Sequence, residues 1–345
     1  MWPFIKPINL IRYLIVWRVN SSMVWQPNYL PLDISLTLGS VISNRLPVRE
    51  AAPWRKALTP WNDYFDLSKP VRKIRKRDRS GKIKVTPNAP WPLQSVIFAY
   101  PGKHTYGEGE LILWELKLLG ENADHTLFLE YILPAIEDAS RKGDMAWHNR
   151  NSLWGNFDTE AIYVARGAQW EPIALHGQLD LTYRPTAIQW AEGFEFDPDL
   201  DYRFNRLTWL TPFDFGLEND EARRLARHRR RAALKPTLQT ITNALLGRIA
   251  QLLPKKHATS NDALALMDEE AQATFNASLE QAARIPIHHQ EFRKSPPGTP
   301  GRLFGEQHFP SIPRPLIPYL QLASILHIGQ HTHYGCGTFS LENYR

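Results

Sequence analysis

Short segments in which apolar and polar residues alternate recur from the N-terminal region to the middle of the chain, the pattern of half-buried β-strands. They are rich in β-branched and aromatic residues and lie at residues 11–19, 111–119, 161–165, 173–183 and 203–210. Residues 126–141 repeat apolar positions at helical spacing up to Gly143. Residues 32–42 also fit a helix, although a strand stays open there. This order of strands and helices predicts an α+β fold.

Proline and charge distinguish the remaining segments. Residues 47–70 carry prolines and tryptophans and are predicted as mostly loop with a short helix. Residues 218–253 are predicted as a helix that opens with acidic residues and is kinked or split at Pro236. A second helix is predicted at residues 261–283, and the proline-rich residues 286–318 are predicted as an extended loop. The remaining predicted elements are a helix at residues 319–326 and a strand at residues 338–341.

The composition limits the class of protein. With 345 residues, 43% of them hydrophobic, the chain is long enough for two domains and can fill real cores. Its one cysteine, Cys336, excludes an internal disulfide and fits a reducing cytoplasm. Charged residues and prolines interrupt the apolar N-terminus, and no window offers the ~20 apolar residues of a membrane span. We therefore expect a soluble cytoplasmic protein that does not enter a membrane.

The net charge of +6 is unevenly distributed. Residues 69–84 hold nine lysines and arginines and one aspartate, and six of the nine residues from Arg223 to Arg231 are arginines. Cations this close together repel one another and are neutralised by a phosphate backbone. Six arginines in nine positions cannot form one stripe on a helix, so they cover more than one face. A solvated charged loop and a solvated basic helix remain the alternatives to nucleic-acid binding.

Residues 327–338 form a glycine-rich segment that follows the last predicted helix. Gly329, Gly335 and Gly337 permit close approach of the backbone to another surface. Backbone N–H groups in such a loop can cradle phosphate groups. Taken alone, the segment fits a tight turn before a strand better than it fits a binding loop.

Several motifs, in the same order along the chain, resemble those of the CRISPR repeat-processing endoribonucleases, members of the repeat-associated mysterious protein superfamily. The glycine-rich segment resembles that family's C-terminal glycine-rich loop, and the apolar helix before it resembles the helix that the family places there. The others are a segment with Tyr-x-x-Gly-Glu that leads into a strand, a strand with Thr-Pro, and a basic stretch with spaced glycines. In order, the motifs are PGKHTYGEGELILWELKLLG (101–120), LTWLTPF (207–213), residues 292–305, IPYLQLASIL (317–326) and residues 327–338. The resemblance covers about residues 95–345, and the first 95 residues match poorly.

The resemblance implies an α+β protein of two tandem ferredoxin-like domains, which are related to RNA-recognition folds. It implies an N-terminal domain at residues 1–200 and a C-terminal domain at residues 201–345. The second domain would carry a basic helical insertion at 218–285 and the glycine-rich loop at 327–338. A hairpin RNA would lie across the basic face of both domains. The implied partners are precursor CRISPR RNA (crRNA), its repeat hairpin and subunits of a CRISPR effector complex.

The chemistry implied by the resemblance is RNA transesterification without a metal or cofactor. The 2′-OH beside the scissile phosphate attacks it and leaves a cyclic phosphate and a 5′-OH. The reaction needs a base, an acid and a cation that stabilises the charged transition state. Many family members use a histidine in the first half of the N-terminal domain, and this chain has none before His104.

Candidates in place of that histidine come from two regions. Near the expected first helix they are Tyr29, Arg45, Arg49 and Lys56. Arginine is a poor base because its pKa stays above ~12, but it orients phosphate and stabilises charge. In the glycine-rich loop, His331 and His333 would point to the same face if the segment were extended, and could supply acid and base. The simpler alternative is that both bond RNA or lie exposed. We assign catalysis to Tyr29, Arg45, Arg49 and His331.

The predicted RNA-binding residues are cationic, glycine and polar positions of these segments. They are Arg223, Arg224, Arg227, Arg230, Arg231, Arg302, Gly329, Gln330, His333, Gly335 and Gly337. The chain also places zinc ligand types close together, but their spacing matches no usual zinc finger and no metal is expected. These residues are His327, His331, His333 and Cys336. His327 falls where the family often has a histidine, so a structural role is favoured there.

Two functions remain open from the sequence. One is a nuclease that cuts precursor crRNA beside its repeat hairpin and retains the product. The other is a non-catalytic subunit of an effector complex that binds the crRNA hairpin. The missing N-terminal histidine favours the subunit slightly, whereas the family motifs favour the nuclease. We predict the nuclease.

Overall fold

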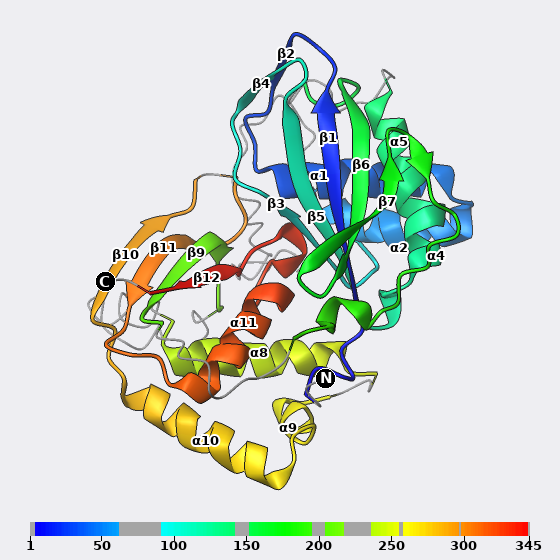
Figure 1. Cartoon of the computed structure of the whole chain (residues 1–345). Coiled ribbons are helices and arrows are strands. Elements are labelled where there is room, and N and C mark those ends of the chain that lie inside the picture. The colour runs from blue at the N-terminus through cyan, green and yellow to red at the C-terminus, as the bar shows by residue number, and fades with distance from the viewer. Residues whose placement is uncertain are drawn as a thin grey trace, which may run out of the picture. The chain divides into compact units, whose positions relative to one another are not determined.

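The structure, a computed structural model, describes residues 4–61, 91–141, 152–194, 204–216, 236–254, 258–296 and 298–343. The chain divides into two compact units. The N-terminal unit comprises Asn9–Gly193 and Pro296–Thr299. The C-terminal unit comprises Met1–Ile8, Phe194–Ser295 and Pro300–Arg345. Each unit contains helices and an antiparallel sheet (Figure 1), which confirms the predicted α+β class.

The N-terminal unit is built on a six-stranded antiparallel sheet. In spatial order its strands are β3 (Ser95–Ala99), β5 (Leu111–Leu119), β1 (Leu10–Val19), β6 (Phe157–Arg166), β7 (Gln169–Leu175) and β8 (Gln178–Leu179). A separate two-stranded ribbon pairs β2 (Met23–Trp25) with β4 (Thr105–Gly107). The strands predicted at 11–19, 111–119 and 161–165 are therefore confirmed.

Residues 173–183 form a tight hairpin rather than the single predicted strand. β7 and β8 pair across His176 and Gly177, whose φ angles are 49° and 77°. Positive φ at two successive residues is the geometry of a type I′ turn, which suits the right-handed twist of paired strands. The prediction was wrong because histidine at the first turn position gives no strong turn signal.

Helices cover one face of this sheet (Figure 1). α1 (Leu30–Arg45) and α5 (Leu133–Ser140) pack on it, and α2 (Val48–Leu58) and α4 (His125–Leu127) lie beside them. A π-helical turn at Phe128–Ile132 joins α4 to α5. The helix predicted at 32–42 is thus confirmed over the alternative strand, and so is the one predicted at 126–141. Single 3-10 turns lie at Thr59–Trp61, Gly120–Asn122 and Gln189–Ala191.

α2 is the short helix that was predicted within residues 47–70, and it occupies most of the described part of that segment. Ala51, Trp54 and Leu58 are buried on one side of this helix, at spacings of three and four residues. Their burial outweighs the cost of Pro53 inside the helix. A helix within this segment was predicted and is confirmed, and residues 62–70 of the segment lie outside the described residues.

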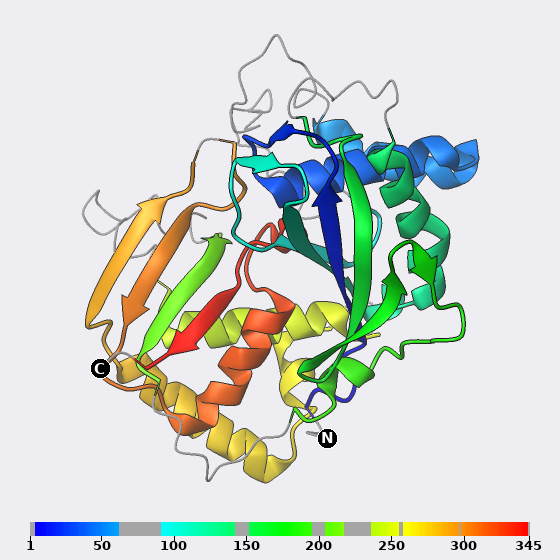
Figure 2. The ribbon, with the colours of Figure 1, turned by 45° about the horizontal axis from the view of Figure 1, so that its top comes forward.

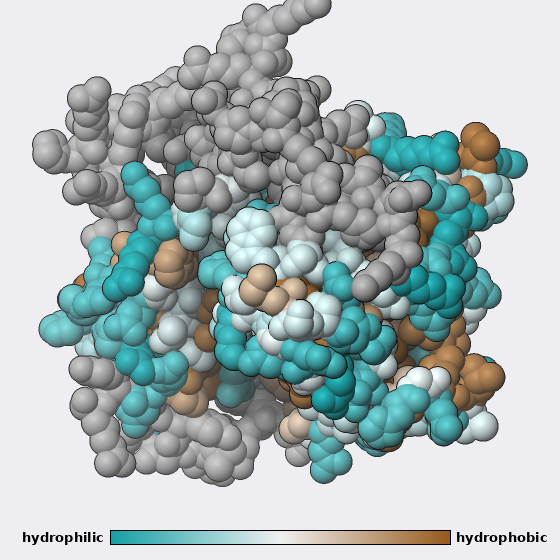
Figure 3. All heavy atoms as spheres, turned by 90° about the horizontal axis from the view of Figure 1, so that it is seen from above, coloured by the Kyte–Doolittle hydropathy of each residue, from teal (hydrophilic) through white to brown (hydrophobic). Residues whose placement is uncertain are grey.

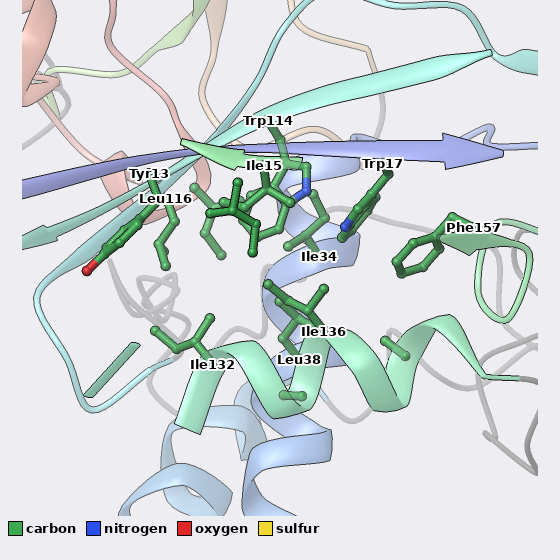
Figure 4. Close-up of a cluster of buried hydrophobic side chains, with 14 of the residues drawn as sticks. Tyr13, Ile15, Trp17, Ile34, Leu38, Trp114, Leu116, Ile132, Ile136 and Phe157 are labelled. Carbon is green, nitrogen blue, oxygen red and sulfur yellow. The ribbon is translucent and has the colours of Figure 1, made fainter. Parts of the chain in front are cut away.

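The core of the N-terminal unit lies between the sheet and the helices α1 and α5 (Figure 4). Alternate residues of β1 and β5 face the helices, because side chains along a strand alternate between its two faces. From the strands these residues are Tyr13, Ile15, Trp17, Trp114 and Leu116, and from the helical segments Ile34, Leu38, Ile132 and Ile136. Trp17 stacks on Phe157 with ring centroids 4.1 Å apart.

One polar contact between buried side chains lies in this core beside α4. Tyr13 OH lies 3.0 Å from His125 Nδ1, and both side chains are buried. Both rings stack with Phe128, at centroid distances of 4.0 Å and 6.2 Å. Burial lowers the pKa of His125, and the charge of Arg184 lowers it further, against a smaller opposite effect of Asp124. The folded chain therefore favours the neutral imidazole.

We expect acid to destabilise the N-terminal unit through His125. Because the pKa of His125 is lower in the folded than in the unfolded chain, the unfolded chain takes up the proton first. The stability that neutral His125 supplies is fully present above the unfolded imidazole pKa of about 6.5 and is lost as the pH falls through the folded pKa. Urea denaturation of the wild-type and His125→Gln proteins between about pH 8 and pH 5 measures this effect.

The difference in free energy of unfolding between these two proteins is expected to shrink as the pH falls. His176→Gln is the matched control, because the His176 side chain is 79% exposed on the β7–β8 turn and contacts no core residue that the structure describes. A difference between wild type and His125→Gln that stays constant over the pH range would contradict the prediction.

The C-terminal unit is built on a four-stranded antiparallel sheet. In spatial order its strands are β10 (His289–Lys294), β11 (Leu303–His308), β9 (Arg206–Phe213) and β12 (Phe339–Glu342). Its helices are α8 (Leu238–Leu252), α9 (Ser260–Leu264), α10 (Glu269–Arg284) and α11 (Ile317–Leu326), with 3-10 turns at Arg314–Leu316 and Thr332–Tyr334. α8 and α11 lie on the same side of the strands in two views (Figure 1 and Figure 2).

Residues 286–318 hold two strands rather than the predicted extended loop. β10 and β11 pair along their whole lengths, from His289 opposite His308 to Lys294 opposite Leu303. The prolines of this segment flank the strands and do not interrupt them, since a proline cannot donate to the ladder of a sheet. The prediction was wrong because the proline content of the whole segment masked two proline-free runs of six residues.

The other predicted elements of the C-terminal half are present with changed limits. The strands predicted at 203–210 and 338–341 correspond to β9 and β12, and the helix at 319–326 to α11. The predicted second helix is divided into α9 and α10, because the Asp268 side chain accepts a bond from the N–H of Ala271 and starts α10. α8 confirms the part of the preceding helix that follows Pro236, whereas residues 217–235 lie outside the described residues.

One face of the described surface is mainly polar. On the face shown in Figure 3, hydrophilic residues cover most of the described surface, and hydrophobic ones form small groups. Met23 and Trp25 of the β2–β4 ribbon are among the exposed large hydrophobic residues. Within the described part of the chain, no helix combines the length and the apolar character needed to cross a membrane.

Candidate nucleic-acid interface

Three segments that are distant in sequence meet at the C-terminal end of β9, within the C-terminal unit. The N–H of Gln330 donates to Asp214 O at 2.7 Å, and the N–H of Gly337 donates to Pro212 O at 3.0 Å. The N–H of Arg302 donates to Phe213 O at 3.0 Å. The glycine-rich loop and the stretch around Arg302 are thus bonded to three successive carbonyl groups. These segments are three of the motifs on which the family resemblance rests.

An ion pair joins two of these segments through their side chains. Arg302 Nε lies 2.9 Å from Asp214 Oδ2, and both side chains are mostly buried. Asp214 Oδ1 also accepts the N–H of Gly216 at 2.9 Å. The guanidinium of Arg302 is therefore already paired with the carboxylate of Asp214. A phosphate bound to Arg302 would have to share this guanidinium with Asp214. The RNA-binding role of Arg302 stays a prediction.

The glycine-rich loop follows a tight path in which five residues have left-handed backbone angles. The φ angles are 57° at His327, 90° at Gly329, 61° at His331, 71° at Gly335 and 85° at Gly337. Glycine adopts such angles freely, whereas the two histidines are strained there. A Cβ atom at Gly337 would lie 1.9 Å from Ile328 O, and one at Gly329 would lie 2.6 Å from Asp214 O. Close backbone packing therefore requires glycine at both positions.

His327 supports this loop from the inside. Its side chain is completely buried, and Nδ1 lies 3.0 Å from Gly335 O and 3.3 Å from Cys336 O. Carbonyl oxygens only accept, so Nδ1 carries the proton and donates. The N–H of Ile328 donates to Gly337 O at 3.1 Å across the same loop. The structural role that was favoured for His327 is confirmed.

His331 and His333 do not present their rings on one exposed face. A 3-10 turn at Thr332–Tyr334 replaces the extended conformation on which that expectation rested. His333 is 1% exposed and His331 is partly exposed. The expectation was wrong because left-handed residues on both sides of the turn let the chain curl. Catalysis by His331 and RNA contact by Gln330 and His333 stay predictions.

The backbone donors of the loop are largely engaged within the C-terminal unit. The N–H groups of Ile328, Gln330, Tyr334, Gly335 and Gly337 all donate to protein carbonyls. A phosphate could use these five groups only if the loop opened. Among the described residues, which include all three loop histidines and buried Cys336, no group of three or more side chains is placed to hold a metal ion.

The candidate catalytic residues of the N-terminal unit lie at two ends of one helix. Tyr29 is the N-cap of α1, and Arg45 is its last residue. At a rise of 1.5 Å per residue, about 24 Å of helix separates them. Arg49 follows in the first turn of α2 and is exposed, as is Lys56. One phosphate cannot contact both ends of α1, so at most one end belongs to a reaction site.

Arg45 also has a packing role. Its guanidinium forms an ion pair with Asp138 of α5, which links the C-terminal ends of α1 and α5. Both side chains are partly exposed, so the pair contributes modestly to stability. A phosphate that contacted Arg45 would compete with this carboxylate, whereas Arg49 has no described ion-pair partner.

The most basic segments of the sequence fall outside the described residues. They are residues 69–84 and the arginine cluster that contains Arg223, Arg224, Arg227, Arg230 and Arg231. Their assignment to RNA binding stays a prediction.

The sequence analysis missed a polar cluster on the face of the N-terminal sheet that is turned away from the helices. Arg12 Nη2 lies 3.1 Å from Glu115 Oε2, and Lys117 Nζ lies 3.9 Å from the same oxygen. Tyr100 OH donates to the other carboxylate oxygen of Glu115. The Arg12 guanidinium carbon lies 5.1 Å from the ring centroid of Trp170, in a cation–π contact.

The charges of this cluster fix its protonation states. Burial acts to raise the pKa of Glu115, but the charges of Arg12 and Lys117 and the bond from Tyr100 outweigh it and hold that pKa below its ordinary value. Burial and the charge of Glu115 raise the pKa of Tyr100. Glu115 and Lys117 alternate with leucines in the strand 111–119, so the sequence did carry a signal that both project from one face.

Comparisons with known proteins give matches among solved structures. No protein-family model and no curated protein matches the sequence. The chain is similar to a structure described as a partial Cas6-RT-Cas1–Cas2 complex, at 15% identity and a TM-score of 0.49, over 97% of this chain and 46% of that chain. Two structures described as Cas6 product complexes are similar at 14% identity each, with TM-scores of 0.47 and 0.41, over 96% and 97% of this chain and 100% of those chains. The chain thus spans less than half the length of the first of these.

Proposed function

We propose that this protein binds the hairpin of a CRISPR repeat and cuts precursor crRNA beside it. The main support is the topology that the two units share. Each contains the element order β-α-β-β-α-β, with β1, α1, β3, β5, α5 and β6 in the N-terminal unit and β9, α8, β10, β11, α11 and β12 in the C-terminal unit. In both sheets the spatial order is second, third, first, fourth strand. This is the split β-α-β order of ferredoxin-like domains, and four-stranded sheets of this kind occur in RNA-recognition modules.

The proposed fold is accordingly two tandem ferredoxin-like domains, at residues 1–200 and 201–345. β7 and β8 extend the first sheet beyond the common pattern. α9 and α10 lie between α8 and β10 and correspond to the later part of the insertion expected at 218–285. A repeated module offers two sheets and two sets of loops to one folded RNA.

The convergence at the end of β9 supports the same proposal. Three motifs of the repeat-processing family are bonded to one another there, although they are separated by up to about 120 residues of sequence. We assign RNA binding to the exposed part of this site, around Gly329 and Gln330, together with Arg302 and the arginine cluster at 223–231. The remaining catalytic candidates are Tyr29, or Arg45 with Arg49, and His331.

The proposed reaction is attack of the 2′-OH on the adjacent phosphate, with a 2′,3′-cyclic phosphate and a 5′-OH as products. It requires no metal ion, and the product hairpin stays bound for transfer to effector-complex subunits. The alternative is a subunit that binds the same hairpin without cutting it. The absence of a histidine before His104 favours that alternative.

Purified protein incubated with a repeat RNA and excess EDTA is expected to give one discrete cut. The 5′ fragment should end in a 2′,3′-cyclic phosphate, because the attacking oxygen belongs to the RNA itself. The same RNA with a 2′-deoxy nucleotide at the cut position is the matched control and should stay intact. Gel electrophoresis and mass spectrometry of the fragments measure both results.

The outcomes separate the two functions. Tight binding of the hairpin without a cut would replace the nuclease by the binding subunit. A cut that needs added Mg²⁺ would overturn the metal-independent mechanism. If the protein neither binds nor cuts the repeat RNA, the whole proposal fails.

A further inference from the structure

An arginine of α8 reaches the point at which α11 ends and the glycine-rich loop begins. α8 and α11 are both helices of the C-terminal unit and lie on the same side of its sheet (Figure 1). Arg248 Nε of α8 donates to Leu326 O, the carbonyl of the last residue of α11, at 3.2 Å. The next residue is His327, which has a φ angle of 57°. Arg248 is therefore bonded to the residue directly before the loop.

This bond gives the carbonyl at the end of α11 a hydrogen-bond donor. The last carbonyls of a helix have no following helical N–H to accept from, and they form the negative end of the helix dipole. A cationic donor at this position satisfies both. At the other end of the loop, Thr338 Oγ1 donates to Ser324 O of α11 at 2.8 Å. The loop is thus tied to the last turn of α11 on both sides.

The charge of Arg248 is not balanced by this arrangement. Within the described part of the chain, no carboxylate lies at ion-pair distance from it, and its other bond is from Nη1 to Gln251 Oε1 at 3.5 Å. A guanidinium offers five N–H donors, so three remain after these two bonds. Burial lowers the pKa of Arg248 to about 10, which still leaves it protonated at neutral pH. A half-buried cation without a counter-ion is costly to maintain unless an anion binds it.

We propose that Arg248 binds a backbone phosphate of the RNA at the start of the glycine-rich loop. This inference rests on the proposed function and adds a contact to it. Phosphate suits the site because its oxygens can accept two parallel bonds from a guanidinium. The same residue positions the loop through Leu326, so phosphate binding and loop geometry are coupled at one side chain.

The variant Arg248→Met separates this role from a purely structural one. Methionine keeps an unbranched apolar stem but removes the charge and all donors. We expect affinity for the repeat RNA to fall at least about tenfold, and the slope of log K against log salt concentration to decrease by about 0.7–0.9, the effect of one phosphate contact. We also expect an unchanged or higher urea midpoint, because the variant removes a half-buried charge that no described carboxylate compensates. A helix-capping role alone predicts a lower midpoint and an unchanged salt slope, and that result would overturn the proposal.

Arg284→Met is the matched control. Arg284 is the last residue of α10, is exposed, and has no described side-chain partner. The Arg284→Met variant should keep both the affinity for the repeat RNA and the salt slope near those of the wild type. Arg248→Lys keeps the charge and should restore most of the slope while recovering only part of the affinity, because lysine lacks the planar pair of donors.

A second experiment, with inorganic phosphate, tests the anion site independently of the proposed function. Inorganic phosphate should raise the thermal midpoint of the wild-type protein and should raise that of Arg248→Met less, since a ligand that binds the folded chain stabilises it. If the wild type bound no repeat RNA but showed this difference with phosphate, the proposed function would fall and the anion site would stand. If the two proteins responded equally to phosphate and had equal salt slopes with RNA, the anion site would fall.

Discussion

Gly337→Ala is expected to lower the free energy of unfolding by about 2–5 kcal/mol, through the C-terminal unit. Two effects add. The φ angle of 85° at this residue is strained for any side chain, which costs about 1–2 kcal/mol. The new Cβ would also lie 1.9 Å from Ile328 O, and backbone rather than a flexible side chain would have to move. That movement breaks the bond from the N–H of Ile328 to Gly337 O or the bond from the N–H of Gly337 to Pro212 O.

Urea denaturation measures this loss, and hydrogen exchange of the loop amides locates it. Gly247→Ala is the matched control, since Gly247 lies inside α8 and a Cβ there would meet no atom within 4 Å apart from its chain neighbours and the backbone of its own helix. It should raise stability by about 0.5–1 kcal/mol, because alanine favours the helix over the unfolded chain. Equal urea midpoints for Gly337→Ala and the wild type would show that the loop is not closed in the way described.

Glu115→Ala is expected to destabilise the N-terminal unit by about 3–5 kcal/mol. The variant removes the one carboxylate that Arg12 and Lys117 share and leaves two mostly buried cations close together. It also removes the acceptor of the Tyr100 hydroxyl. Breaking a buried ion pair by deleting one partner costs far more than the pair itself contributes, because the other charge stays desolvated.

The matched control for this loss is Glu137→Ala, which removes an exposed carboxylate from α5. Its effect should stay within about 0.5 kcal/mol. Addition of salt should change the stability of Glu115→Ala little, because buried charges are weakly screened. Similar urea midpoints for Glu115→Ala and Glu137→Ala would contradict a coupled cluster around Glu115.

Strong periodic patterns allowed much of the fold to be predicted. β1 and β5 were predicted because alternate residues of each strand enter the same core, and this produces a period of two. α11 was predicted from a run of apolar residues that ends where the glycines begin. In these segments the pattern of buried residues and the local preference for a helix or a strand favour the same structure, so each supports the other.

The wrong predictions share a physical cause. They relied on local composition, whereas the segments are stabilised by strand pairing and burial that only the folded chain shows. β10 and β11 have few apolar residues and stabilise each other across the pair, so the prolines around them dominated the prediction. α2 was predicted only as a short helix in a segment that was otherwise predicted as loop, because the burial of Trp54 beside Pro53 is seen only in the folded chain.

The sequence predicted which residues belong to the candidate site better than it predicted how these residues are arranged. The sequence showed that glycines and histidines cluster at 327–338 and favoured a structural role for His327, but it did not show that His333 is buried. The path of the loop depends on the bonds from the N–H groups of Gln330 and Gly337 to Asp214 O and Pro212 O, more than 100 residues earlier in the chain. The separation of Tyr29 from Arg45 could have been predicted, since a helix at 32–42 already implied their distance. Arg248 carried no local signal, because its site consists of a carbonyl from another helix.

The edges of the two sheets bear on how the protein behaves at high concentration. An exposed strand edge presents unpaired N–H and C=O groups to which a second molecule can add, the first step of many aggregates. β8 ends the N-terminal sheet with a pairing of only two residues, too short to template another chain. β10 ends the C-terminal sheet, and its sequence, HQEFRK, places charged side chains on this edge. A chain with two sheets and 43% hydrophobic residues is thereby protected from edge-to-edge self-association at these two strands.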